Sequence, residues 1–158
     1  MTHDGFSMDL ELNGKVAIVG GASNGLGRAC ADVLAAEGAK LVVCTRTRAD
    51  IEQAAKEIAA KTRAEVLPYA GDLEREDTIR KLVAAAVERY GRLDILVNNS
   101  GGPPIAKSNA TEEQWATAVQ RSLLYFARMC REALPHLKKA KGGRIVNILA
   151  STVYQPIP

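Results

Sequence analysis

Short apolar runs alternate with longer amphipathic stretches along the chain. Each run has the length of a buried strand, and each longer stretch repeats its apolar residues at the spacing of a helix. Clusters of glycine, proline and asparagine separate the two kinds of segment. The predicted strands begin at residues 15, 41, 65, 93 and 143, and the predicted helices cover residues 26–37, 49–61, 77–90 and 111–139.

This alternation predicts a parallel sheet, because parallel neighbours need a crossover and right-handed crossovers place helices against the faces of the sheet. We expect an open, doubly wound α/β sheet in the order 3-2-1-4-5, which forms a ligand crevice where the winding reverses. One domain would take up residues 1–158, with residues 1–11 as a tail. The alternation stops after the fifth strand, so we expect a fold truncated there, with its C-terminal part missing from this chain.

The composition of the chain excludes several classes of protein and partner. Hydrophobic residues make up 47% and charged residues 25% of the chain, as in an ordinary globular domain. The net charge of +3 is not gathered into a basic run, and no apolar run could span a membrane, so neither nucleic acid nor a membrane is an expected partner. Scattered cysteines predict free thiols and a cytoplasmic location. Neither His3 nor His136 has partners at metal-ligand spacing, so no metal is expected.

A glycine-rich segment, GGASNGLG at residues 20–27, joins the first predicted strand to the first predicted helix. Gly21 allows a tight exit from the strand, Gly25 lets the backbone approach a pyrophosphate, and Gly27 lets the helix lie close to the sheet. The helix N-terminus adds free N–H groups and the positive end of its dipole. We expect a Rossmann-type dinucleotide-binding turn, with Gly21, Ser23, Asn24, Gly25, Leu26 and Gly27 as its cofactor-binding residues.

Three motifs, in the correct order, resemble those of the short-chain dehydrogenase/reductase family, and most closely its 3-oxoacyl-acyl-carrier-protein reductase-like members. The resemblance extends over residues 12–156. It implies an oxidoreductase that moves hydride between NAD(P) and a small carbonyl or alcohol substrate, working as a homodimer or homotetramer. The matching residues are Gly21, Gly25 and Gly27 of TGxxxGxG, with Gly20 in place of the threonine, then Asp72 and Leu73 after the third strand, and Asn98, Asn99, Ser100 and Gly101 for NNAG.

The resemblance also implies roles for the residues after the third and fourth strands. Asp72 and Leu73 would flank the adenine, and residues 99–101 would line the ribose side of the cofactor. Asn98 and Asn99 are both expected to bind the cofactor, and a structural role can hold together with this, because turn asparagines can tie one strand to its neighbour by side-chain hydrogen bonds.

The end of the second strand bears on the choice of cofactor. An acidic residue there would bind the ribose 2′-hydroxyl of NAD and repel a 2′-phosphate, but the sequence at residues 44–48 is CTRTR. Thr45 offers a hydroxyl, and Arg46 offers a guanidinium that can hold a phosphate through two hydrogen bonds. We therefore expect NADP(H). NAD(H) is the alternative, because an arginine in a loop is also stable when it is solvated and binds no phosphate.

The catalytic residues of the family are matched poorly. The resemblance implies a tyrosine with a lysine four residues later, a serine and an asparagine, but no tyrosine of this chain has that lysine. Ser122 takes the position of the asparagine, and Ala150 takes that of the serine. Ser151 lies one residue further, so it would substitute only if a bulge turned it to the same face. The tyrosine and lysine would be expected beyond the end of this sequence.

Three hypotheses follow. The first is an NADP(H)-dependent, 3-oxoacyl-acyl-carrier-protein reductase-like oxidoreductase with Ser122 and Ser151 as catalytic candidates. The second is a dinucleotide-binding protein without dehydrogenase activity, a sensor or partner subunit, which the departures at Ser122 and Ala150 favour. The third is another nucleotide-binding Rossmann-type domain such as a methyltransferase, and the NNSG motif at residues 98–101 argues against it.

Overall fold

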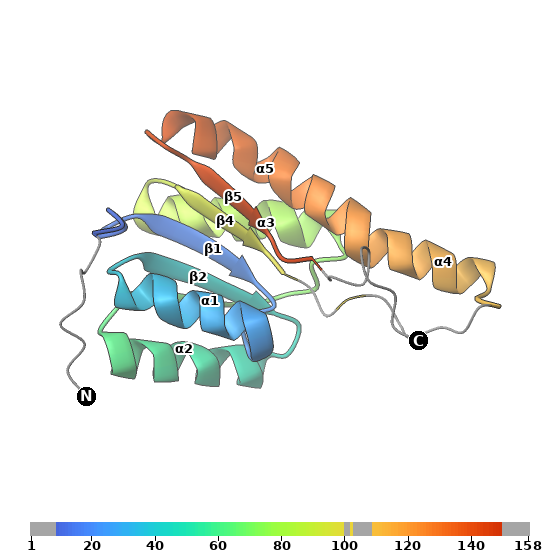
Figure 1. Cartoon of the computed structure of the whole chain (residues 1–158), viewed down its shortest axis with the longest axis horizontal. Coiled ribbons are helices and arrows are strands. Elements are labelled where there is room, and N and C mark those ends of the chain that lie inside the picture. Colours follow the sequence, from blue (N-terminus) through green and yellow to red (C-terminus); the bar gives the residue numbers. More distant parts are fainter. Residues whose placement is uncertain (1–8, 100–101, 103–108, 150–158) are drawn as a thin grey trace.

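The computed structural model describes residues 9–99, 102 and 109–149. Its strands form one parallel sheet in the order β3-β2-β1-β4-β5, which confirms the predicted fold class and strand order (Figure 1). The elements are β1 (Val16–Gly20), α1 (Gly25–Ala36), β2 (Lys40–Thr45), α2 (Arg48–Thr62), β3 (Val66–Ala70), α3 (Glu76–Tyr90), β4 (Ile95–Asn98), α4 (Glu112–Val119), η1 (Gln120–Leu124), α5 (Tyr125–Lys139) and β5 (Arg144–Asn147).

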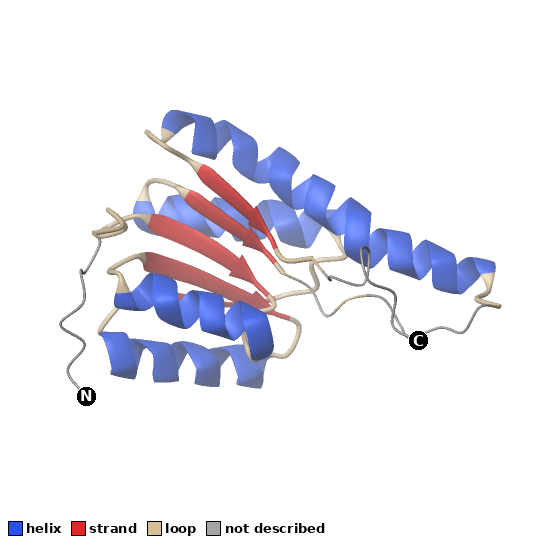
Figure 2. Ribbon diagram, in the orientation of Figure 1, coloured by secondary structure: helices blue, strands red, loops and turns tan. Residues whose placement is uncertain are grey.

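Helices cover both faces of the sheet, with α1 and α2 on one face and α3 and α5 on the other (Figure 2). Side chains of β1 alternate between the two cores. Ala17 and Val19 pack toward α1 and α2, while Val16 and Ile18 pack toward α3 and α5. Because both faces are covered, all five residues of β1 are buried, which is why the strand reads as a continuous apolar run.

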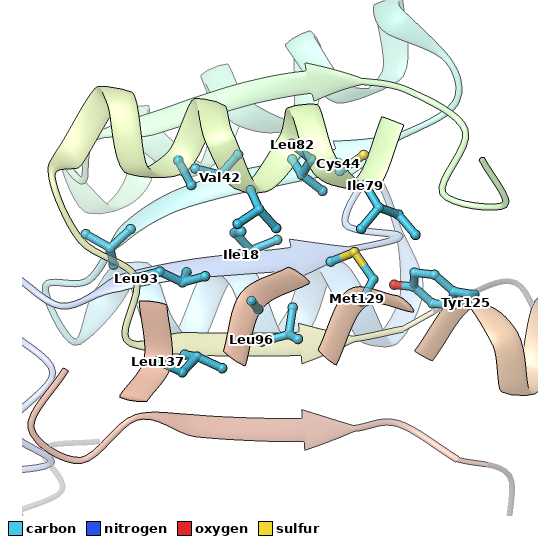
Figure 3. Close-up of a cluster of buried hydrophobic side chains, with 14 residues drawn as sticks. Ile18, Val42, Cys44, Ile79, Leu82, Leu93, Leu96, Tyr125, Met129 and Leu137 are labelled. Carbon is cyan, nitrogen blue, oxygen red and sulfur yellow. The ribbon is translucent and has the colours of Figure 1, made fainter. Parts of the chain in front are cut away.

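The fourth predicted helix is interrupted. It consists of α4, one turn of π-helix (η1) and α5, and the π-turn closes with a hydrogen bond from the Tyr125 N–H to the Gln120 carbonyl. Residues 111–134 contain no glycine or proline to mark the π-turn, so the sequence predicts one uninterrupted helix there. The interruption lets α5 pack on the sheet, where Tyr125 and Met129 are buried (Figure 3). Helix α4 extends past the ends of the strands, and Trp115 is 61% exposed there.

A buried carboxylate, Asp94, joins the starts of β1 and β4. It is 2% exposed, accepts a hydrogen bond from the Val16 N–H at 2.9 Å, and accepts two from the Arg92 guanidinium at 2.8 and 2.6 Å. Burial by itself would raise the pKa of Asp94. The hydrogen bonds from Arg92 and Val16 and the nearby positive charges outweigh burial and hold the pKa below its ordinary value.

Asp94→Asn is therefore expected to lower the free energy of unfolding by about 1.5 kcal/mol at neutral pH, because a charge-assisted pair is lost from a buried site. A carboxylate with a depressed folded-state pKa stabilises the fold above its unfolded pKa of about 3.9 and loses that contribution as pH falls through the folded value. Urea melts of both proteins from pH 7 to pH 2.5 check this. The difference between them should shrink below about pH 4, and a constant difference would contradict the assignment.

Candidate dinucleotide-binding site

A groove runs along the carboxyl edge of the sheet, where β1 and β4 lie side by side and the winding reverses. It encloses about 560 Å³. Ten of the predicted cofactor-binding residues line it, from the carboxyl ends of β1, β2, β3 and β4 and from the start of α1. They are Gly21, Ser23, Asn24, Gly25, Leu26, Thr45, Arg46, Asp72, Leu73 and Asn99.

The N-terminus of α1 opens onto this groove. Its N-cap residue, Asn24, makes no side-chain capping hydrogen bond, and the first turn contains no acidic residue. The N-terminus of α4, in contrast, is closed by a capping box between Thr111 and Gln114. The positive end of α1 is therefore left without a capping side chain beside the groove, as an anion-binding helix N-terminus requires.

Asn99 connects the glycine-rich turn to the end of β4. Its amide nitrogen donates to the carbonyls of Gly20 at 3.3 Å and Gly21 at 3.2 Å. A Cβ at Gly21 would lie 2.7 Å from that amide nitrogen, and one at Gly27 would lie 2.6 Å from it. Both positions exclude a side chain, so α1 and the turn can approach β4 only with glycine. Gly27 is accordingly buried behind the turn and supports the groove without lining it.

The side of the groove next to β2 carries mixed charge. Arg46 is exposed and lines the groove, and among the described residues it forms no ion pair. Asp50, in the first turn of α2, also lines the groove. The sequence pattern did not indicate Asp50, because it follows β2 by five residues and reaches the groove only through the turn into α2.

Side chains from η1 and α5 hold the loop after β3. Gln120 and Arg128 donate to the Glu74 carbonyl at 2.8 and 3.2 Å, and the Arg121 Nε donates to the Glu74 carboxylate at 2.7 Å. Asp72 accepts the Glu74 N–H at 3.0 Å, which fixes the loop where Asp72 and Leu73 meet the groove. Groove residues that sequence reasoning missed are Thr47, Asp50, Gly71, Glu74, Gly102, Arg121 and Tyr125.

Two other predicted site residues, Asn98 and Ser122, do not line the groove. Asn98 is buried and donates to the Asn147 Oδ1 of β5 at 2.9 Å, so it ties two strands together. Ser122 is exposed within η1 and does not line the groove. Ser100, Gly101 and Ser151 fall outside the described residues.

Two buried titratable groups lie beneath the groove. Burial, and secondarily the charge of Asp72, raises the pKa of the Cys44 thiol to about 12. Burial also raises the pKa of Tyr125. Both groups are neutral at physiological pH, so the floor of the groove supplies hydrogen-bonding and packing atoms rather than charge. Across the described ranges, no cluster of His, Cys, Asp or Glu is arranged to hold a metal ion.

The doubly wound sheet and the glycine-rich groove at its switch point define a Rossmann-type α/β domain. The sequence profile described as short chain dehydrogenase matches residues 15–158. The chain therefore belongs to the short-chain dehydrogenase/reductase family.

Individual relatives agree with this assignment. The chain is 39% identical over 143 residues to 1,6-dihydroxycyclohexa-2,4-diene-1-carboxylate dehydrogenase of Pseudomonas putida, which covers 89% of this chain and 52% of that protein. It is 31% identical over 140 residues to 3-oxoacyl-[acyl-carrier-protein] reductase of Thermotoga maritima, which covers 88% and 56%. The structure of L-sorbose reductase from Gluconobacter frateurii with NADPH and L-sorbose matches with a TM-score of 0.90 at 30% identity, covering 95% and 57%.

The chain thus spans little more than half the length of these relatives. Within the part that the structure describes, none of the helices is both long enough and apolar enough to cross a bilayer.

Proposed function

We propose that this chain binds NADP(H) and belongs to an oxidoreductase that interconverts a carbonyl and an alcohol, with 3-oxoacyl-acyl-carrier-protein reductase-like chemistry as its closest parallel. The observation that carries the proposal is the groove itself. It combines an α1 N-terminus without a capping side chain with an exposed arginine at the end of β2. NAD(H) is the alternative cofactor, and Asp50 is the residue that favours it.

The residues of the groove fit the parts of such a cofactor. N–H groups at the start of α1 would bind the pyrophosphate, and the open space at Gly25 leaves room for it. Arg46, with the Thr45 hydroxyl, would hold the 2′-phosphate, and Asp72 and Leu73 would flank the adenine. Once bound, the nicotinamide would supply or accept the hydride. Leu26, 66% exposed where it lines the groove, offers an apolar surface for the cofactor to cover.

A second candidate is a dinucleotide-binding protein without dehydrogenase activity, which senses the cofactor or partners an active subunit. Two features favour it. Ser122, at the position of the family's asparagine, is exposed away from the groove. In addition, Ala150 stands at the position of the family's serine. For the oxidoreductase, Ser151 and Ser122 remain the proposed catalytic residues within this chain.

Cofactor titration followed by turnover distinguishes these proposals. Protein of verified intact mass is titrated with NADPH and NADH, and NADPH oxidation is then followed over a panel of ketones, aldehydes and 3-oxoacyl thioesters. Binding with carbonyl-dependent oxidation supports the oxidoreductase. Tight binding without turnover on any carbonyl favours the sensor or partner subunit, and failure to bind either dinucleotide rejects both.

The cellular location, oligomeric state and partners of the protein are also proposals. We propose a cytoplasmic homodimer or homotetramer that acts on a small molecule and not on nucleic acid or a membrane. The three cysteines are free thiols, which supports a reducing compartment. Trp115, Val119 and Leu123 are exposed along α4 and η1, which supports burial of this face against another subunit.

A further inference from the structure

An unusual contact lies at the base of the groove, between the end of β1 and the start of α5. Tyr125 is only 1% exposed although it contributes to the groove lining. In Figure 3 its ring projects from the start of α5 beside Met129 and Ile79. Its hydroxyl donates to the Asn99 carbonyl at 3.4 Å.

Gly20, the last residue of β1, lies against the Tyr125 hydroxyl. A Cβ at Gly20 would collide with the Tyr125 hydroxyl, and it would also lie 3.1 Å from the Asn99 carbonyl and 3.3 Å from the Leu73 side chain. The space beside Gly20 is therefore already filled, chiefly by the phenol. The short-chain dehydrogenase pattern has threonine at this position, whereas here glycine leaves the space that the Tyr125 phenol occupies.

The contact extends to the dinucleotide turn through Asn99. Tyr125 holds the Asn99 carbonyl, and the Asn99 amide in turn holds the carbonyls of Gly20 and Gly21. Tyr125 itself donates the backbone bond that closes the π-turn, so its position is fixed by the interruption between α4 and α5. The π-turn, Tyr125, Asn99 and the glycine-rich turn thus form one continuous chain of hydrogen bonds.

We propose that Gly20 and Tyr125 are a matched pair, in which the Tyr125 hydroxyl fills the space beside Gly20 and positions Asn99, and with it the glycine-rich turn, for binding the dinucleotide. Tyr125 is a positioning residue and not a catalytic one. The inference rests on the proposed dinucleotide site and deepens it, since a tyrosine at residue 125 then requires a glycine at residue 20.

The test compares wild type with Tyr125→Phe, Gly20→Ala and the double variant by NADPH titration and urea unfolding. Tyr125→Phe is expected to weaken NADPH binding about fivefold, the equivalent of one lost hydrogen bond. Gly20→Ala should weaken it by more than about tenfold, because the buried Tyr125 hydroxyl would have to shift before the added methyl group fits. Since the phenylalanine removes the colliding atom, the double variant should return to within about twofold of Tyr125→Phe alone.

Tyr90→Phe is the matched control. Its hydroxyl also donates to a backbone carbonyl at 3.4 Å, that of Leu41, but it does not line the groove. NADPH affinity should be unchanged in this variant. The pairing is overturned if Gly20→Ala binds NADPH like wild type, or if the losses of the two single variants simply multiply in the double variant.

Failure of the proposed function can be told apart from failure of the pairing. If wild type binds neither NADPH nor NADH, the dinucleotide site is wrong, and the pairing is then judged by whether Tyr125→Phe recovers the urea midpoint lost in Gly20→Ala. If Gly20→Ala does not fold, recovery of folded protein in the double variant supports the pairing, and no recovery overturns it.

Discussion

Gly25→Trp is expected to weaken NADPH binding by at least about 100-fold, an amount that corresponds to roughly 2.7 kcal/mol. Gly25 is the first residue of α1, and no heavy atom lies within 4 Å of the position that its Cβ would take. A large side chain there would extend into the groove without disturbing the core, and would occupy the space at the helix N-terminus that a pyrophosphate needs. NADPH titration by fluorescence or calorimetry measures the loss.

The backbone at Gly25 has a φ of +55°, so any side chain there also adds strain. Gly91→Trp controls for this strain. Gly91 has a φ of +74° and equally open surroundings, but it follows α3 and does not line the groove. Both variants should lose similar amounts of stability, while only Gly25→Trp should lose NADPH binding. Equal affinities in the two variants would mean that the anion site at α1 has been wrongly assigned.

The sheet was predictable because its strands are covered on both faces. Continuous apolar runs such as that of β1 have few alternative placements, and crossover geometry then leaves few topologies. The π-turn at residues 120–124 was not predictable, because no glycine or proline marks it within the helical stretch. The sharpest departure from the sequence-based prediction therefore lies beside the groove, where Arg121 and Tyr125 enter the lining.

The candidate site also has a part that the sequence predicted and a part that it missed. The glycine-rich turn was predictable because its function depends on local backbone geometry, which the spacing of Gly21, Gly25 and Gly27 specifies. Asp50 and Tyr125 were missed because they reach the groove through tertiary packing, from α2 and α5. No local motif marks such residues. The absence of a side chain at Gly20 was the one available signal for Tyr125, and it became informative only when the structure showed what fills the space.

We propose that the choice between cofactors depends on Arg46 and Asp50, and we expect Arg46→Ala to shift the preference from NADPH to NADH. Arg46 lines the groove next to β2 with no ion pair among the described residues to compete for its guanidinium. Loss of a charge-assisted contact to the 2′-phosphate should weaken NADPH binding about 50-fold. NADH affinity should stay within about twofold, because the 2′-hydroxyl carries no charge for Arg46 to bind.

Arg48→Ala provides the matched control for this loss of positive charge. Arg48 lies two residues further along, is 76% exposed and pairs with Glu52, and it does not line the groove. If Arg46 acts by direct contact, Arg48→Ala should leave the ratio of NADPH to NADH affinity near the wild-type value. Equal losses in both variants would mean that the basic loop attracts phosphate only through its general charge, which raising the salt concentration would then remove. The choice of cofactor would in that case depend on other residues of the groove, with Asp50 the first to test.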